Sequence, residues 1–207
     1  MTLPSRLRSW CALASIAFGL LSTTALASPS SIVPGKQVGS LRIKLYPKGV
    51  PGVKPDYEDG AMGQYVGMWV SKERNKAALP VNTLIVKFSS NEFVDNGGPG
   101  ESLFYIRVTS SEFHDSHGLS TGSTLASIER VYRHLKPVDG KTGVLADDNL
   151  GIGFDFGISH PAAASRCIAI SVYDKGDTVL FDAGDVHGLV ADWKSGDHGS
   201  LLPGNSP

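Results

Sequence analysis

The stretch GLSTGSTLASIERVYRHLKP, residues 118–137, decides the fold because it carries the clearest helix signal in the chain. Its apolar residues recur every three or four positions and would form one stripe along a helix. Ser123 is the expected N-cap, since its hydroxyl can accept from a first-turn amide, and Pro137 ends the helix because it cannot continue the backbone hydrogen bonding. We predict a helix over residues 124–136, packed on a sheet through Leu125, Ile128, Val131, Tyr132 and Leu135.

Runs rich in β-branched and aromatic residues lie on both sides of this helix and predict strands. Polar connections containing Gly and Asn separate several of these runs and favour antiparallel hairpins. The expected fold class is therefore α+β, with one antiparallel sheet, or two tandem pseudo-repeated sheets, packed by the helix. The predicted strands cover residues 41–45, 64–71, 81–89, 101–110, 150–156 and 166–173.

One of these strands, residues 150–156, contains a carboxylate between two aromatic residues. Alternation places Phe154 and Phe156 in the core and turns Asp155 to the opposite face, which we expect to be solvated. Only an inward carboxyl would have a raised pKa suited to acid–base chemistry. The pattern therefore gives Asp155 no catalytic assignment.

The two halves of the chain share an order of elements, which suggests an internal duplication. A Gly-Ser turn opens each half, at Val38-Gly39-Ser40 and at Thr121-Gly122-Ser123. Segments rich in Ser, Pro, Gly and Asp before and after the two units predict loose ends. The expected organisation is a flexible arm at 28–40, a first α/β unit at 41–110, a second at 111–181, and a loose C-terminal tail at 182–207.

Residues 1–27 have the composition of an export signal. Arg6 and Arg8 precede the apolar run CALASIAFGLL, and Ala25-Leu26-Ala27 has the small-x-small pattern of a cleavage site. The apolar run is too short to span a bilayer comfortably. We therefore expect a mature chain without a transmembrane segment, exported to the periplasm or secreted.

The charge and the cysteine content argue against nucleic-acid binding and against a reactive cysteine. Loss of Arg6 and Arg8 with the signal would change the net charge from −1 to −3, and no cluster of basic residues stands out, so we expect no nucleic-acid partner. Cys167 would then be the single cysteine, which leaves no internal disulfide. Its apolar surroundings favour a buried structural thiol over a nucleophile.

Two patches of the sequence carry a resemblance. GLSTGSTLASIERVY resembles a pattern that precedes a helix in small exported bacterial domains, and IVPGKQVGSLRIKL with PDYEDGAMGQYVGMWVS resembles the front half of uncharacterised envelope proteins. Wider similarity is to the small lipoproteins of the outer-membrane barrel assembly machinery and to the β-lactamase inhibitory protein. This resemblance implies a helical segment packed on an antiparallel sheet, in tandem copies in the inhibitory protein. The chain lacks the lipid-attachment Cys and the first-copy helix, so no binding residues are transferred.

The cluster Phe113-His114-Asp115-Ser116-His117 is the strongest candidate for chemistry. His114, Asp115 and His117 could bind a metal or transfer protons, but a zinc site needs at least three ligands. No spacing selects a further donor from elsewhere in the chain. A solvated loop with Asp115 or Ser116 capping a turn is the simpler interpretation, so we expect no cofactor.

Two aromatic residues are candidates for an interaction surface. Tyr65 and Trp69 share one face of the predicted strand at residues 64–71. That face either packs in the core or, if exposed, binds a partner. The function favoured by the sequence is a soluble, non-catalytic envelope module that binds another envelope protein or a small ligand. The alternative is a metal-dependent or hydrolytic enzyme centred on the His114/Asp115/His117 loop.

Overall fold

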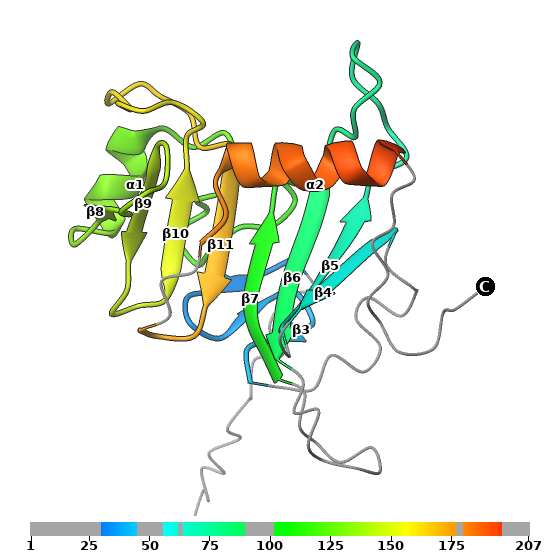
Figure 1. Cartoon of the computed structure of the whole chain (residues 1–207). Helices are drawn as coiled ribbons and strands as arrows, with labels where there is room; N and C mark the ends of the chain where they lie inside the picture. Colours follow the sequence, from blue (N-terminus) through cyan, green and yellow to red (C-terminus); the bar gives the residue numbers. More distant parts are fainter. Residues whose placement is uncertain (1–29, 45–55, 62–63, 90–101, 177–179, 196–207) are drawn as a thin grey trace, which may run out of the picture.

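A computed structural model describes residues 30–44, 56–61, 64–89, 102–176 and 180–195. Its main element is an antiparallel sheet of eight strands in the order β4-β5-β6-β7-β11-β10-β9-β8 (Figure 1). The fold is α+β, as predicted. The strands of this sheet are β4 (Tyr57–Ala61), β5 (Gln64–Val70), β6 (Thr83–Ser89), β7 (Ser102–Val108), β8 (Lys136–Pro137), β9 (Val144–Asp147), β10 (Ile152–Asp155) and β11 (Ala169–Tyr173).

The sheet consists of two four-stranded meanders that meet at its centre. Strands β4 to β7 form one meander and β8 to β11 the other. Their last strands pair with each other, with Ile106 opposite Val172 and Tyr105 opposite Tyr173. Both meanders therefore belong to one continuous sheet. The internal duplication, and the unit boundaries drawn from it, remain predictions.

One face of the sheet packs on the helix α1 (Leu125–Val131) and on a small sheet of β1 (Ile32–Val33), β2 (Gln37–Val38) and β3 (Leu41–Arg42). Ile32 and Val38 are buried in the same apolar core as Ile128 and Phe154. The segment expected to be a flexible arm thus contributes two short strands to the core. The composition of this segment predicts flexibility, but the burial of Ile32 and Val38 explains why it is ordered. Their apolar contacts offset the conformational entropy that the backbone loses.

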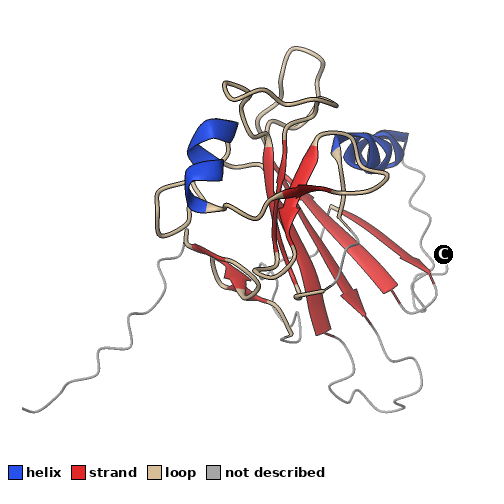
Figure 2. Ribbon diagram, turned by 90° about the vertical axis from the view of Figure 1, so that its left-hand side faces the viewer, coloured by secondary structure: helices blue, strands red, loops and turns tan. Residues whose placement is uncertain are grey.

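The second helix, α2 (Ala183–Ser195), lies on the opposite face and runs across the strands (Figures 1 and 2). Its residue Val190 packs on Met68 of β5 and Ile85 of β6. Both faces of the sheet are therefore covered, so side chains that alternate along a strand are buried on either side. Within the described residues, neither helix is long and apolar enough to cross a membrane.

The predicted helix over residues 124–136 is present but shorter than expected. Its N-cap is Thr124, whose Oγ1 accepts a hydrogen bond from the Ser127 amide, and not Ser123. The helix ends at Val131, and Lys136 is extended in β8. Pro137 disfavours a helical conformation for the residue before it, which shortens the helix from that end.

The tail expected to be loose contains α2, which sequence reasoning missed. Gly184 and Gly188 lower its helix propensity and hide the helical pattern. Asp182 caps this helix: its Oδ1 accepts from the amides of Gly184 and Asp185, at 2.8 and 3.0 Å. The Asp185 carboxylate accepts in return from the Asp182 amide, at 2.8 Å. This reciprocal capping is readable in the sequence as an acidic pair three residues apart.

Strands β4 and β9 lie outside the segments that the sequence predicts to be strands. Val144 and Ala146 of β9 are buried, and β9 pairs with β10 along its whole length. Strand β4 pairs with β5 from Tyr57 opposite Met68 to Ala61 opposite Gln64. Each of the two segments pairs with a neighbour, β5 or β10, that the sequence does predict to be a strand. This pairing makes them strands, because strand preference depends on context more than on composition.

Candidate ligand-binding site

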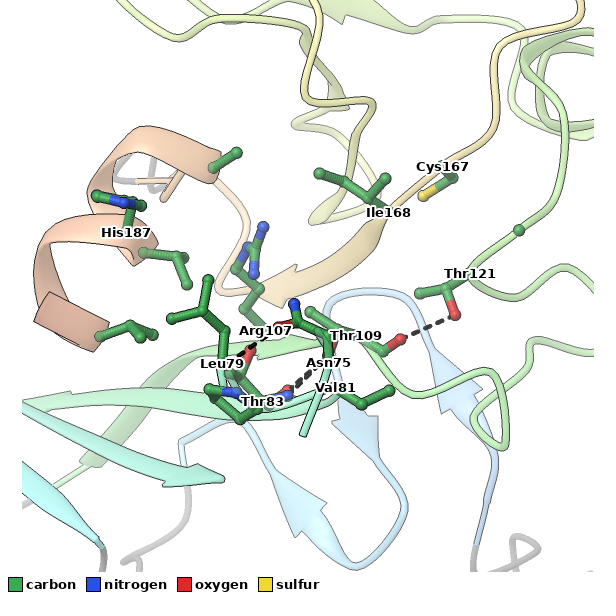
Figure 3. Close-up of a pocket in the computed structure, with 15 residues that line it drawn as sticks. Asn75, Leu79, Val81, Thr83, Arg107, Thr109, Thr121, Cys167, Ile168 and His187 are labelled. Carbon is green, nitrogen blue, oxygen red and sulfur yellow. Dashed lines mark hydrogen bonds between the residues drawn. The ribbon is translucent and has the colours of Figure 1, made fainter. Parts of the chain in front are cut away.

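A cavity of about 530 Å³ lies between α2 and the central strands of the sheet (Figure 3). Thr83 of β6 and Arg107 of β7 form its floor, and Val186 of α2 forms one wall. Its size falls in the range of sites for small organic molecules. The remaining lining residues are Asn75, Leu79, Pro80, Val81, Thr109, Thr121, Gly122, Cys167, Ile168, Ala183, His187 and Val190.

The cavity reaches the surface beside two exposed apolar side chains. Val81 and Ile168 are 47% and 43% exposed and both line the cavity. They are two of the four large hydrophobic residues exposed in the described part of the chain, the others being Leu150 and Ile158. An apolar molecule entering the cavity would cover both of these side chains.

Arg107 is the charged residue of the cavity floor, and its guanidinium points into the space between α2 and Ile168 (Figure 3). Its Nη2 donates to Asp155 Oδ2 at 2.7 Å, and both side chains are 2% exposed. Its Nε and Nη1 have no hydrogen-bond partner among the described residues. Those two nitrogens carry three of the five N–H groups of an arginine. A buried cation with most of its donors unused is unusual in a folded protein.

Asp155 reaches Arg107 from β10, two strands away from β7. Phe154 and Phe156 pack in the core beneath α1, as alternation predicted. The prediction that Asp155 faces water was wrong, since its side chain is buried. The face of the sheet opposite α1 is covered by α2 and by the residues just before it. Burial raises the pKa of the Asp155 carboxyl, and the charge of Arg107 opposes that shift. The amide of Gly157 holds the other oxygen, Oδ1, at 2.8 Å.

Cys167 lines the cavity as a neutral thiol. Burial raises the pKa of Cys167 to about 12, and its Sγ donates to the Ala169 carbonyl at 3.0 Å. A thiol that stays protonated is a poor nucleophile. Thr83 adds a second unused polar group, since its Oγ1 is buried without a partner in the described residues. The cavity therefore presents donors at its floor and mostly apolar side chains on its walls.

The His114/Asp115/His117 loop lies on a different part of the molecule. Asp115 is buried, and its Oδ1 accepts from the amides of His117 and Leu119, each at 2.8 Å. Its Oδ2 accepts from Tyr132 Oη at 2.7 Å and lies 3.3 Å from His117 Nδ1. Burial, with Asp115 alongside, raises the pKa of the Tyr132 phenol. Asp115 thus ties its own loop to the end of α1.

Both histidines of that loop are exposed. His114 is held by its backbone, whose carbonyl accepts from Ile32 at 2.7 Å. Among the described residues, no three His, Cys, Asp or Glu side chains converge in a way that could hold a metal ion. His198 and Asp197, two further potential metal ligands in the sequence, lie outside the described residues. The metal assignment remains an untested prediction.

The two aromatic candidates, Tyr65 and Trp69, both lie in β5. Trp69 is partly buried and packs against the core beneath α1, while Met68 faces α2. Trp69 also lines a shallow hollow of about 290 Å³ beside Thr83 and Phe113. The backbone of Tyr65 lies in β5, and its side chain lies outside the described part of the chain. An interaction surface at Tyr65 and Trp69 remains a prediction.

Sequence reasoning missed Arg107, which is the central residue of the cavity. The available signal was a single arginine inside the apolar strand SLFYIRV. A long charged side chain in a strand that is buried on both faces must find a partner or a cavity. The sequence alone did not indicate that both faces are buried.

Comparison with known proteins assigns no family. No protein family matches the chain, and no curated protein matches it. Among solved structures, the chain is similar to an uncharacterized protein, yfeY, from Escherichia coli. The two are 13% identical with a TM-score of 0.33, over 69% of this chain and 97% of that one. At that similarity, no statement about site or activity is transferred.

Proposed function

We propose that this protein is an exported, non-catalytic module that binds a small amphipathic molecule in the cavity beneath α2. The observation that carries the proposal is Arg107, whose buried guanidinium points into that cavity while its Nε and Nη1 have no hydrogen-bond partner among the described residues. Each unsatisfied buried donor costs about 1–3 kcal/mol. A ligand oxygen that accepts from these donors regains part of that cost on binding.

The apolar side chains that line the cavity favour a ligand with a hydrocarbon part. Leu79, Val186 and Val190 line the cavity together with Arg107, and the exposed side chains of Val81 and Ile168 line it as well. Burial of apolar ligand surface contributes about 25 cal/mol per Å² before the entropy costs of association. A molecule with one acceptor end and a hydrocarbon body therefore matches both parts of the cavity.

The chemistry of the lining supports binding without catalysis. Cys167 stays protonated, and Asp155 is engaged by Arg107 and by the Gly157 amide. His187 lies at the exposed rim on α2. Within the described lining, these groups do not form a nucleophile with an adjacent base, which covalent catalysis needs.

Export is proposed from the N-terminal sequence. The run of residues 11–21 after Arg6 and Arg8, with Ala25-Leu26-Ala27, supports cleavage before Ser28. The resemblance to exported envelope proteins, and the wider one to the β-lactamase inhibitory protein, agree with this location and remain predictions. Mass spectrometry of the protein isolated from its cells tests export, since a mature chain beginning at Ser28 is expected and an intact N-terminus would contradict it.

Titration calorimetry with octanamide tests the binding function. This straight-chain primary amide has one acceptor oxygen and a flexible apolar body, and the wild-type protein is expected to bind it saturably. The double variant Arg107→Met with Asp155→Asn removes the donors and both charges together, and should weaken binding at least about tenfold, or ~1.4 kcal/mol.

A matched double variant controls for the chemical change itself. Lys44→Met with Asp174→Asn removes an ion pair of 2.9 Å whose side chains are 70% and 33% exposed, and neither residue lines the cavity. Its affinity for octanamide should equal that of the wild type. Absence of saturable binding to the wild type, or equal loss in both variants, would reject the proposed site.

A further inference from the structure

We infer that the ligand meets Arg107 with an uncharged acceptor group, such as an amide, ester or ketone oxygen, and not with a carboxylate. This inference rests on the proposed function and narrows it to a chemical class. It concerns the end of the ligand on the cavity floor and leaves the apolar body unspecified.

Arg107 and Asp155 balance each other's charge at the floor of the cavity. Asp155 Oδ2 lies 2.7 Å from Arg107 Nη2, and both side chains are almost fully buried. Among the described lining residues, Arg107 is the single one with a permanent charge. The positive charge is thus already matched by a carboxylate, although most of the N–H donors are unused.

A second carboxylate acts on the same region. Burial is the main cause of the raised pKa of Asp155, and the negative charge of Asp182, at the N-terminus of α2, adds a smaller effect in the same direction. An anionic ligand would therefore add a further negative charge beside Asp155 and near Asp182. Burying an unmatched charge costs several kcal/mol in a protein interior.

A neutral acceptor avoids this cost. A carbonyl oxygen can accept from Nε or Nη1 while Nη2 stays with Asp155. Thr83 supplies a buried hydroxyl that can also donate to it. The cavity floor thus offers donors without excess charge, which favours an uncharged oxygen acceptor.

The test compares two ligands that differ only in charge, octanamide and octanoate, by calorimetry at pH 7. The wild-type protein is expected to bind octanamide at least about tenfold more tightly, a ratio that corresponds to ~1.4 kcal/mol. Tighter binding of octanoate would overturn the inference and leave the proposed cavity intact. Binding of neither ligand would overturn the proposed function and the inference with it.

A charge-neutralisation test uses Asp155→Asn, which keeps the size of the side chain and an oxygen for the Gly157 amide. Removing the carboxylate leaves Arg107 unmatched, so the variant is expected to prefer octanoate. Asp174→Asn, at the exposed pair with Lys44, is the control and should keep the wild-type preference. An unchanged preference in Asp155→Asn would overturn the inference.

A second measurement covers the case in which Asp155→Asn does not fold. Octanesulfonate keeps its charge at every pH of interest, so its binding to the wild type reports the protein's own protonation. Its affinity is expected to rise as the pH falls and Asp155 becomes protonated, while the affinity for octanamide changes little. An affinity for octanesulfonate that does not change between pH 7 and pH 4 would overturn the inference.

Discussion

Two buried polar side chains in this molecule, Asp115 and Arg107, differ in how their hydrogen bonds are used. Asp115 receives hydrogen bonds from two backbone amides and from the Tyr132 hydroxyl, all supplied by its own neighbourhood. Arg107 donates from Nη2 to Asp155, lines a cavity, and has no partner for Nε or Nη1 within the part of the chain that the structure describes. The first pattern stabilises a fold, and the second is what a ligand can complete.

The comparison reverses the ranking that the sequence suggests. His114, Asp115 and His117 form a cluster of residue types common in active sites, yet Asp115 is occupied in holding a loop to α1. Arg107 stands alone in an apolar strand and carries no motif. Unused hydrogen-bonding capacity next to a cavity distinguishes the two better than residue type does.

The largest expected loss of stability follows from breaking the ion pair between Arg107 and Asp155. Arg107→Met alone leaves Asp155 as an uncompensated buried charge and should lower the free energy of unfolding by about 3–5 kcal/mol. The double variant Arg107→Met with Asp155→Asn removes both charges and should recover most of that loss. Urea denaturation of the three proteins measures both values. A double variant no more stable than Arg107→Met would contradict the assigned pairing.

Asp115 should show a smaller effect that is confined to stability. Asp115→Ala leaves the Tyr132 hydroxyl and the Leu119 amide without an acceptor and should cost about 2–3 kcal/mol. Asp174→Ala, which removes a half-buried carboxylate paired with the exposed Lys44, should cost less than about 1 kcal/mol. Folded Asp115→Ala should bind octanamide like the wild type, and weakened binding would place this loop in the site.

The pH dependence of stability separates Asp155 from Asp182. Burial raises the folded-state pKa of Asp155, so its contribution is present below the unfolded value, about 3.9, and is lost as pH rises through the higher folded value. Burial also acts to raise the pKa of Asp182, but hydrogen bonds from the amides of Thr142, Asp185 and Gly184 outweigh it and lower that pKa. Its contribution is present above about 3.9 and is lost as pH falls through the lower folded value.

Urea titrations between pH 3 and pH 6 test this assignment. Asp155→Asn should reduce the loss of stability that the wild type shows as pH rises above about 4, and Asp182→Asn should reduce the loss below it. Identical pH profiles for the two variants would contradict the assignment.

The smallest expected effect on stability comes from substituting His114 and His117. His114 and His117 are exposed, and no third metal donor joins them in the described part of the chain. The double variant His114→Ala with His117→Ala should keep the wild-type melting temperature, both with and without equimolar zinc. Zinc that raises the melting temperature of the wild type but not of the variant would support a metal site in this loop and weaken the comparison.

Much of the sheet could be predicted from local pattern. The predicted strands at residues 64–71, 81–89 and 166–173 coincide with β5, β6 and β11 within a few residues. The position of α1 was also predicted, because its apolar spacing is regular. Strand β9 and helix α2 were missed, since pairing with β10 and packing on Met68 and Ile85 decide them.

The site could not be predicted, because it depends on strand order. Arg107 and Asp155 are 48 residues apart and lie on strands separated by β11. Ser171 of β11 pairs with Arg107 on one side and with Gly153 on the other, and this register brings the two charges together. Alternation correctly separated Asp155 from Phe154 and Phe156, but could not show that α2 covers its face.

The nuclear magnetic resonance signal of the Arg107 Nε–H group tests the central claim most directly. The signal can be assigned by its absence from the variant Arg107→Met with Asp155→Asn. If the unpaired donors of Arg107 bind the ligand, this signal shifts saturably on titration with octanamide, in parallel with the calorimetric binding curve. A signal that stays fixed while octanamide saturates the protein would contradict the claim.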